Sequence, residues 1–445
     1  MYIVVYAQNN YNEARTVIET VRQYSPAYIN KLVLVDVNSS DGLRVWAGEQ
    51  TDFTYVYFDE SITPGKAFNE VIEGLELRDD ILFCDSNYVF LPGCIERLER
   101  LMESDRDIFA AGVVAPVFEG MQNHYFDSFE DACDWSVAQD NGIKSIDTML
   151  LHGGVITINS KYIEMRVLFD EEIADLENLF LEYQLRAFLK HNRIVISLNS
   201  AVWDLRGNDH LVIRDTGCDV IKNKYGMHYL NTDGNPHLID IVSELSSPDD
   251  KIRILEIGCD CGGTLFRLKQ IFPNASVYGT DINEAALRMA SVFATVKESD
   301  IQKLDLDFGE NDFDYILFGD VLEHLRNPLD VLKYCRKMMA PNGRIVASIP
   351  NIMHISVMKD LLDGHFIYKD SGIMDRTHIH MFTYNEIRSM FETDAGFNIY
   401  EITGVRTTNE ETEAERVLIE KLLALSNETD RFMYDTAQYL VVAGN

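Results

Sequence analysis

IRILEIGCDCGG, residues 252–263, has the pattern of a buried strand, a glycine-rich turn and the start of a helix. The apolar run 252–257 predicts a parallel strand, and the following TLFRLKQIF has its apolar residues at helical spacing. Glycine suits the turn because a side chain would keep a ligand away from the backbone N–H groups at the helix start. The stretch therefore predicts a ligand-binding unit in an α/β domain.

Acidic side chains surround this predicted turn. The run SVYGTDI predicts the next strand, and Asp281 at its end comes 19 residues after Gly262 (281 − 262), a spacing that suits a carboxylate on ribose hydroxyls. The loop has no Lys or Arg, so a dinucleotide with its pyrophosphate is electrostatically disfavoured. S-adenosylmethionine carries a sulfonium and an ammonium group, which an acidic site favours. The carboxylates concerned are Glu256, Asp260, Asp281 and Asp300.

Four motifs in order resemble those of class I S-adenosylmethionine-dependent methyltransferases: LEIGCDCGG, TDI at 280–282, SDI at 299–301 and DVLEHLRNPLDVL at 320–332. The resemblance extends from about residue 235 to the C-terminus. It implies that Asp300 binds the adenine amino group, and it differs at Asp260, where the family often has glycine. A glycine-rich turn in another α/β domain is the alternative. The implied cofactor-binding residues are Glu256, Gly258, Cys259, Asp260, Gly262, Asp281, Ile282, Asp300, Ile301, Phe318 and Gly319.

Length and composition limit the remaining possibilities. A chain of 445 residues is long enough for two or three domains. The net charge of −33, from 39 basic and 72 acidic residues, argues against a nucleic-acid partner. The seven cysteines lack zinc-site spacing. The N-terminus has no basic leader, and no apolar run reaches about 18 residues, so we expect a cytoplasmic protein without a transmembrane segment.

The first half alternates strands and helices, which predicts a parallel sheet. Asp36 and Asp41 follow the second predicted strand, where ligands bind in open α/β sheets. A later strand delivers Asp85, Ser86 and Asn87. The predicted strands are 2–7, 31–37, 53–58 and 80–84, and the predicted helices are 13–24 and 66–77.

This half resembles family 2 glycosyltransferases of the GT-A fold over residues 1–208. The similarity rests on YNEA at 11–14, VDVNSSDG at 35–42, GKAFN at 65–69, CDSN at 84–87 and LPGCIERL at 91–98. It implies that Asp36 contacts a nucleotide base and that Asp85 and Asn87 hold Mg²⁺ or Mn²⁺, because a leaving diphosphate needs its charge neutralised. Asn87 replaces a carboxylate and brings less charge. The implied nucleotide-sugar-binding residues are Gln8, Asp36, Lys66, Asp85 and Asn87.

A general base is needed to take the proton of an acceptor hydroxyl. The segments LHGGVITIN at 151–159 and FDEEIADLENLFLEYQLRAF at 169–188 resemble the acceptor side of the same family. One alignment nominates Glu182 and another Glu177, and neither recovers the full carboxylate pair. Both could instead be solvated charges on a helix face.

The stretch 203–236 is rich in Asn, Asp and Gly and predicts a linker. We therefore expect one domain at 1–228, including this linker, and a second at 229–445. The expected fold is α/β, with a GT-A-like domain followed by a Rossmann-like seven-stranded methyltransferase sheet. A charged helix at 410–426 would cover the acceptor site, pack on the first domain or form a dimer contact. The second sheet's expected strands are 252–257, 276–282, 295–297, 311–318, 344–349, 397–405 and 437–443.

Two later motifs concern the methyl acceptor. Helical spacing would place Asp320, Glu323 and His324 on one face. The DVLEH pattern resembles quinone-type O-methyltransferases, some of which hold Mg²⁺ with such residues. The alternative is that these residues form only a capped helix start. The segment DRTHIH at 375–380 resembles one in methyltransferases attached to glycosyltransferase domains. His378 or His380 is then the candidate base, unless these histidines serve packing.

The expected function is that of a bifunctional glycan-modifying enzyme. The second domain would methylate a sugar hydroxyl using S-adenosylmethionine, and the first would transfer a sugar from a nucleotide sugar to a glycan or glycoconjugate. One alternative makes the first domain a non-catalytic glycan- or nucleotide-binding module. Another assigns a quinone-like acceptor. The oligomeric state stays open.

Overall fold

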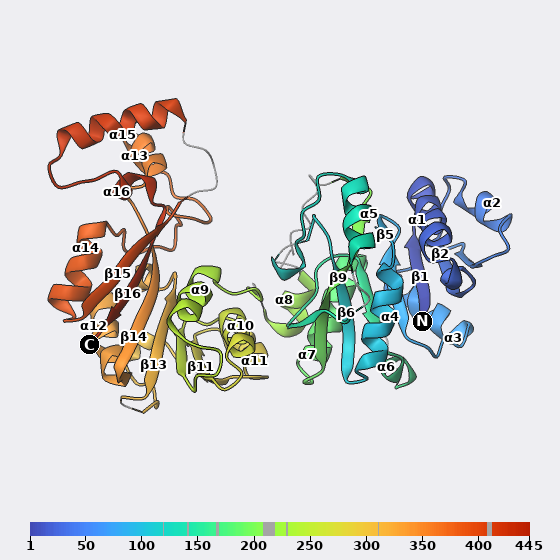
Figure 1. Cartoon of the computed structure of the whole chain (residues 1–445), viewed down its shortest axis with the longest axis horizontal. Coiled ribbons are helices and arrows are strands. Elements are labelled where there is room, and N and C mark those ends of the chain that lie inside the picture. Colours follow the sequence, from blue (N-terminus) through green and yellow to red (C-terminus); the bar gives the residue numbers. More distant parts are fainter. Residues whose placement is uncertain are drawn as a thin grey trace. The chain divides into compact units, whose positions relative to one another are not determined.

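The computed structural model describes the chain apart from residues 119, 140–141, 166–168, 208–218, 228–229, 310 and 407–411. The chain divides into two compact units, Met1–Tyr229 and Leu230–Asn445. Each unit has its own sheet flanked by helices (Figure 1). Among the described residues, no helix is both long and apolar enough to cross a bilayer.

The first unit is built on a mixed sheet in the order β3-β2-β1-β4-β8-β6-β9-β5, with β7 paired to β9. The four strands at one end, β3 to β4, are parallel, so the loops after β1, β2 and β4 leave the sheet at one edge. The strands are β1 (Tyr2–Ala7), β2 (Leu32–Val37), β3 (Thr54–Phe58), β4 (Ile81–Asp85), β5 (Tyr88–Phe90), β6 (Ile108–Val114), β7 (Ser145–Thr148), β8 (Val155–Ile158) and β9 (Arg193–Asp204).

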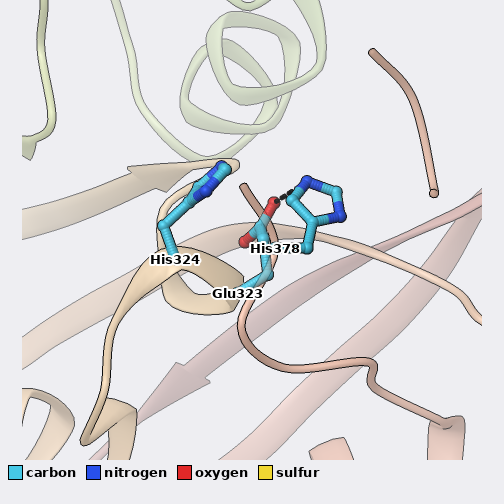
Figure 2. A group of neighbouring side chains, drawn as sticks. All are labelled: Glu323, His324 and His378. Carbon is cyan, nitrogen blue, oxygen red and sulfur yellow. Dashed lines mark ion pairs between the residues drawn. The ribbon is translucent and has the colours of Figure 1, made fainter. Parts of the chain in front are cut away.

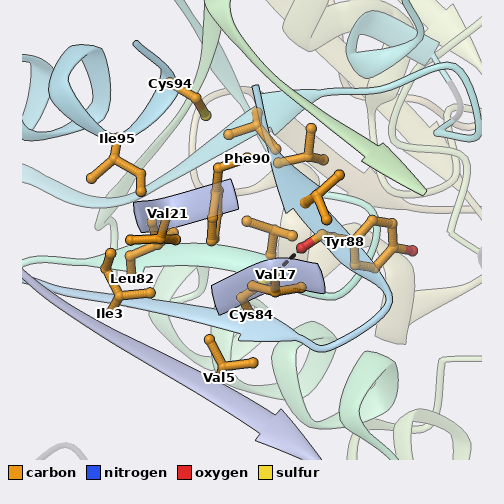
Figure 3. Close-up of a cluster of buried hydrophobic side chains, with 14 of the residues drawn as sticks. Ile3, Val5, Val17, Val21, Leu82, Cys84, Tyr88, Phe90, Cys94 and Ile95 are labelled. Atoms are coloured by element: carbon orange, nitrogen blue, oxygen red, sulfur yellow. Dashed lines mark hydrogen bonds between the residues drawn. The ribbon is translucent and has the colours of Figure 1, made fainter. Parts of the chain in front are cut away.

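Helix α1 shows how this sheet is covered. Its buried residues Val17 and Val21 face Ile3, Val5 and Leu82 of the central strands (Figure 3), and burying each such side chain stabilises the fold by about 1.5–3 kcal/mol. The helices of this unit are α1 (Tyr11–Tyr24), η1 (Pro26–Lys31), α2 (Leu43–Gly48), α3 (Pro64–Gly74), α4 (Cys94–Ser104), η2 (Gly120–Gln122), α5 (Phe129–Ala138), α6 (Ser160–Glu164), α7 (Leu176–Phe188) and α8 (Asp219–Tyr225).

The second unit is the expected seven-stranded sheet, in the order β12-β11-β10-β13-β14-β16-β15. The first five strands in this order are parallel, β16 runs antiparallel to β14, and β15 runs antiparallel to β16. The order reverses beside β10, which is where open α/β sheets bind ligands. The strands are β10 (Arg253–Ile257), β11 (Ser276–Asp281), β12 (Thr295–Glu298), β13 (Phe313–Gly319), β14 (Met339–Pro350), β15 (Asn398–Val405) and β16 (Gln438–Gly444).

Two apolar clusters, one that includes Ile316 and Val441 and one that includes Leu265 and Leu317, form the core of this unit. The helices are α9 (Pro236–Leu245), α10 (Gly263–Ile271), α11 (Glu284–Ala290), η3 (Ile301–Lys303), η4 (Leu322–His324), α12 (Pro328–Met338), α13 (Ile355–Leu362), α14 (Tyr384–Arg388), η5 (Ser389–Asp394), α15 (Glu413–Leu425) and α16 (Phe432–Asp435).

The stretch predicted as a linker is more structured than expected. Strand β9 continues to Asp204 because its end pairs with β5, with Tyr88 opposite Asp204. Helix α8 lies within the same stretch. Part of the prediction falls on residues 208–218 and 228–229, outside the described residues.

The charged helix between β15 and β16 is α15, and the first residues of its predicted range lie outside the described residues. Its Ile419 is fully buried against Ile355 of α13 and Tyr434 of α16. Val417 and Leu425 of this helix are 38% and 85% exposed. The helix therefore packs on its own domain through Ile419, with Leu418, Leu422 and Leu423 partly buried beside it.

Candidate functional site

The turn after β10 has the backbone conformation that its glycines predict. Gly258 and Gly262 have φ of +73° and +87°, and a Cβ at Gly258 would lie 2.6 Å from Cγ2 of Val321. Asp260, which replaces a family glycine, has a φ of +47°, and aspartate tolerates this left-handed region better than most residues. The turn thus keeps its shape despite the substitution.

Asp281 ends β11 and is fixed by two backbone groups. Its Oδ2 accepts a hydrogen bond from the Asp260 N–H at 2.8 Å, and its Oδ1 accepts one from the Asn283 N–H at 2.8 Å. Each carboxylate oxygen can accept a further bond. The side chain is therefore preoriented for ligand hydroxyls.

A cavity of about 380 Å³ lies at the carboxyl ends of β10, β11 and β13. Five predicted cofactor-binding residues line it: Gly258, Asp281, Ile282, Asp300 and Ile301. The remaining lining residues are Ile257, Thr280, Ser299, Gln302, Asp320, Val321, His324 and Leu325. The other six predicted residues, Glu256, Cys259, Asp260, Gly262, Phe318 and Gly319, are not among its lining residues.

Glu256 lies in β10, where it is only 4% exposed. Burial raises its pKa to about 8, with smaller contributions from the charges of Asp260 and Asp281. Its Oε2 has no hydrogen-bond partner among the described residues. A cation bound nearby would favour the ionised form, because it would supply the missing opposite charge.

Glu323, His324 and His378 form a cluster next to the cavity (Figure 2). One ligand atom from each residue lies within 4.8 Å of the others, and Nε2 of His378 is 4.0 Å from Oε1 of Glu323. The His324 and His378 rings meet edge to face at 4.8 Å. Backbone N–H groups of Ile379 and His380 donate to the Glu323 carbonyl oxygen, which holds the 375–380 loop against η4.

The chemistry of this cluster fits a divalent metal ion, but the resemblance implied Asp320 with Glu323 and His324, whereas the structure groups the latter two with His378. Nδ1 of His324 contacts the Thr377 carbonyl oxygen at 3.2 Å, and Nδ1 of His378 contacts that of Ile373 at 3.0 Å. Each Nδ1 therefore carries the proton, leaving a lone pair on Nε2, the usual arrangement of metal-binding histidines. Both carboxylate oxygens of Glu323 are buried without a hydrogen-bond partner among the described residues.

Burial shifts the pKa values of the ionisable side chains around the cluster. The pKa of Glu323 is raised to about 8 by burial and then by the charge of Asp320. The pKa of Asp320 is itself raised by burial, and this carboxylate accepts a hydrogen bond from Gln438. Burial lowers the pKa of His378, so its imidazole is neutral near pH 7 and able to accept a proton.

His380 faces a different cavity. Its Nε2 contacts the Arg326 carbonyl oxygen at 3.2 Å and its ring stacks on Phe382. It lines a second cavity, of about 500 Å³, together with Glu386 and Asp394. Of the two predicted base candidates, only His378 has its side chain in the cluster beside the cofactor cavity, whereas His380 contacts Glu323 through its backbone N–H alone.

In the first unit, the predicted nucleotide-binding residues are not all accessible. Gln8 is exposed directly after β1. Asp36 is fully buried, and its carboxylate accepts hydrogen bonds from the Tyr55 hydroxyl at 2.7 Å and the Ser39 N–H at 3.2 Å. Lys66 lies in the first turn of α3, with Nζ 3.9 Å from Glu70. Base contact by Asp36 remains a prediction.

Asp85 and Asn87 are held together after β4. Oδ1 of Asp85 accepts hydrogen bonds from the backbone N–H of Asn87 at 2.9 Å and from its side-chain amide at 2.7 Å. Arg206, which follows β9, bonds to Asp204 and to the Tyr88 hydroxyl. Sequence reasoning missed Arg206 because it lies within the predicted linker.

The two candidate general bases of this unit lie in different environments. Glu177, in the first turn of α7, is exposed, and its charge acts on Tyr88 beside Asp85. The side chain of Glu182 is 0% exposed. Lys224 and Tyr225 of α8 each donate a hydrogen bond to its Oε1 at 2.7 Å. Glu182 thus fixes α8, and Glu177 is the candidate that an acceptor could reach.

Comparisons with known proteins agree with the two units. The family model described as glycosyl transferase family 2 matches residues 2–151, and one described as methyltransferase domain matches residues 230–402. Among curated proteins, a ubiquinone biosynthesis O-methyltransferase of Alkalilimnicola ehrlichii is 29% identical over 141 residues, 30% of this chain and 56% of that protein. Its counterpart in Parvibaculum lavamentivorans is 29% identical over 177 residues, 36% of this chain and 63% of that protein.

The chain therefore matches less than two thirds of the length of each of these relatives. Among solved structures, an S-adenosylmethionine-dependent methyltransferase from Archaeoglobus fulgidus is 19% identical, covers 51% of this chain and 99% of its own, and has a TM-score of 0.34. The matched residues, the seven-stranded sheet and the glycine turn identify the second unit as a methyltransferase domain. The chain therefore joins a domain similar to glycosyl transferase family 2 to a methyltransferase domain.

Proposed function

We propose that the second domain transfers the methyl group of S-adenosylmethionine to a hydroxyl group of a glycan or glycoconjugate. The observation that carries this proposal is the cavity whose lining includes Asp281, Asp300 and Asp320, with His324 linking it to the Glu323–His378 cluster. Carboxylates on the cavity wall suit a ligand with a sulfonium and an ammonium group. The cluster supplies proton-accepting groups beside the same cavity.

Methyl transfer requires little chemical catalysis from the residues of this chain. The sulfonium is already activated, so placing the acceptor in line with the methyl group supplies much of the rate. Asp281 would hold the ribose hydroxyls and Asp300 the adenine amino group. The acceptor hydroxyl loses its proton to Nε2 of His378, which is unprotonated because Nδ1 faces the Ile373 carbonyl oxygen.

A divalent metal ion is compatible with this site. Glu323, His324 and His378 would hold it, and a bound cation lowers the pKa of a hydroxyl that contacts it. Metal binding and proton acceptance by His378 exclude each other, because both use the Nε2 lone pair. Activity in EDTA distinguishes them: full activity assigns His378 as the base, and lost activity restored by Mg²⁺ or Mn²⁺ assigns it as a ligand.

The two histidines of the 375–380 loop provide a matched test. Extracts of host glycans are incubated with the protein and S-adenosylmethionine carrying a labelled methyl group. We expect His378→Ala to abolish label transfer while calorimetry shows unchanged S-adenosylmethionine binding, and His380→Ala to retain transfer. Retained transfer by the folded His378→Ala variant would overturn the assignment.

The proposed sugar acceptor is supported by the fusion itself. A domain of glycosyl transferase family 2 in the same chain suggests that both domains act on one glycan. The first domain would bind a nucleotide sugar and transfer its sugar, with Glu177 as general base. Glycan mass spectrometry of the host with and without this protein should show the joint loss of one sugar and one methyl group. Loss of the methyl group alone would favour a non-catalytic first domain.

Two observations favour competing functions. The engagement of Glu182 by α8 supports a first domain that only binds a glycan or nucleotide. Release of sugar from labelled nucleotide sugars, measured with and without acceptor, would exclude that role. The matched relatives named for ubiquinone biosynthesis support a quinone-like acceptor, and methylation of catechols or hydroquinones but not of glycans would establish it.

A further inference from the structure

Family 2 glycosyltransferases of the GT-A fold use a divalent metal ion at the position of Asp85 and Asn87, and the residues here do not fit one. A hard cation needs oxygen ligands with free lone pairs. The Asn87 side chain instead directs its amide nitrogen at Oδ1 of Asp85, at 2.7 Å. The same Oδ1 also accepts the Asn87 backbone N–H. The two residues bind each other where the family would have them bind a metal.

A second carboxylate, that of Asp204, lies close enough to this loop for its charge to act on Asp85. Asp204 has a side chain that is 0% exposed, and both of its oxygens accept hydrogen bonds from Arg206. The distances are 2.9 Å from Nε to Oδ1 and 2.7 Å from Nη2 to Oδ2. Planar two-point bonding of this kind fixes the guanidinium in position. A metal ion could bind Asp204 only by displacing a buried ion pair, which costs several kcal/mol.

Backbone pairing explains why Arg206 lies beside Asp85. Strand β5 pairs with β9, and the Leu205 N–H donates to the Asn87 carbonyl oxygen at 2.8 Å. Nη2 of Arg206 also donates to the Tyr88 hydroxyl at 2.7 Å. The Arg206 side chain is still 30% exposed, so one edge of the guanidinium can reach a ligand.

The charge of Arg206 acts on Asp85. Burial raises the pKa of Asp85, while the Asn87 hydrogen bonds and the Arg206 charge lower it. Burial disfavours the charged guanidinium, but its bond to Asp204 and the charges of Tyr88, Asp204 and Asp85 outweigh this and raise its pKa. The site therefore contains a permanent cation, which repels an incoming divalent ion.

We infer that the guanidinium of Arg206 takes the place of the divalent metal ion in the first domain, and that a nucleoside diphosphate binds there without metal. Arginine suits this role because its planar N–H groups match phosphate oxygens. The inference rests on the proposed nucleotide-sugar function for what the site binds. The absence of a metal site at Asp85 can be measured separately.

The first experiment counts Mn²⁺ ions by electron paramagnetic resonance in the full chain carrying Glu323→Gln, which disables the cluster in the second domain. Adding Asp85→Asn to this variant should leave the number and affinity of bound Mn²⁺ ions unchanged. The loss of one Mn²⁺ ion on adding Asp85→Asn would overturn the inference. Both variants are compared only if they melt cooperatively.

The second experiment titrates UDP, GDP, ADP, CDP and TDP into the wild-type chain by calorimetry, once in EDTA and once in Mn²⁺. We expect one of these nucleotides to bind with the same affinity in EDTA and in Mn²⁺. Arg206→Lys should weaken that binding at least 10-fold. Arg193→Lys, at a surface position at the start of β9, should leave it unchanged. Binding that requires Mn²⁺ would overturn the inference. If no nucleoside diphosphate binds, the proposed nucleotide function fails, and the inferred diphosphate binding fails with it. An unchanged Mn²⁺ count would then still show that Asp85 holds no metal ion.

Discussion

The cofactor-free protein should become less stable as the pH rises, because it buries Glu256. Replacing Glu256 by Gln should abolish this pH dependence. Burial raises the pKa of this carboxyl from 4.5 to about 8. Between these two values the unfolded chain has released the proton and the folded chain still holds it, so folding becomes less favourable with increasing pH. The stabilisation is present in full below the unfolded pKa and is lost as the pH rises through about 8.

The size of the effect follows from the width of that pH window. One pH unit corresponds to about 1.36 kcal/mol, so a window from 4.5 to about 8 gives about 5 kcal/mol. For a domain the size of the second unit, each kcal/mol moves the melting temperature by about 2–4 °C, so the expected difference is about 10 °C or more.

The assay is thermal unfolding of the full chain in EDTA at about pH 5 and about pH 8, followed by calorimetry so that the two domains are resolved. The methyltransferase transition of the wild type should fall by more between these two conditions than that of Glu256→Gln. Glu244→Gln, at an exposed carboxyl of α9, should behave like the wild type. An equal pH dependence in wild type and Glu256→Gln would refute the reasoning.

Three further predictions concern both domains. Gly258→Ala should weaken S-adenosylmethionine binding and cost about 1–2 kcal/mol of stability, because residue 258 has a positive φ and an added Cβ would meet Val321. Calorimetry measures the binding and thermal melting the stability, and unchanged values would contradict the turn geometry. Glu182→Gln should destabilise the first domain by about 1.5–3 kcal/mol, because the buried carboxylate that bonds to Lys224, Arg186 and Tyr225 loses its charge. It should leave nucleoside diphosphate binding intact, and lost binding in a stable variant would place Glu182 in the site. If His378 is the base, methyl transfer should fall as the pH drops through a value below 6.5, because burial lowers the pKa of its imidazole; a pH–rate profile without that acidic limb would exclude the role.

The sequence predicted those features that depend on neighbours along the chain. The glycine turn, the strand ending at Asp281 and the seven-stranded sheet follow from local patterns and are confirmed by the structure. Asp300 and Ile301 were found because the SDI motif at 299–301 resembles one of the methyltransferase motifs. Pattern alone could place residues at the sheet edge, but not decide which of them line the cavity.

Features that depend on distant pairing could not be predicted. His378 joins Glu323 because backbone N–H groups of the 375–380 loop donate to the Glu323 carbonyl oxygen, and no spacing rule indicates that contact. Arg206 lies beside Asp85 because β9 runs on to pair with β5, whereas the local composition indicated a linker. The ion pair of Glu182 with Lys224 similarly depends on α8, a helix inside the same stretch.

The central claim is that the acidic cavity at the ends of β10 and β11 binds a cationic adenosyl donor. Isothermal titration calorimetry of the full chain with S-adenosylmethionine and, separately, with NAD⁺ tests it most directly. The account predicts one bound S-adenosylmethionine per chain, loss of that binding in Asp281→Ala, and no heat from NAD⁺. Binding of NAD⁺ without S-adenosylmethionine, or full S-adenosylmethionine affinity in Asp281→Ala, would contradict it.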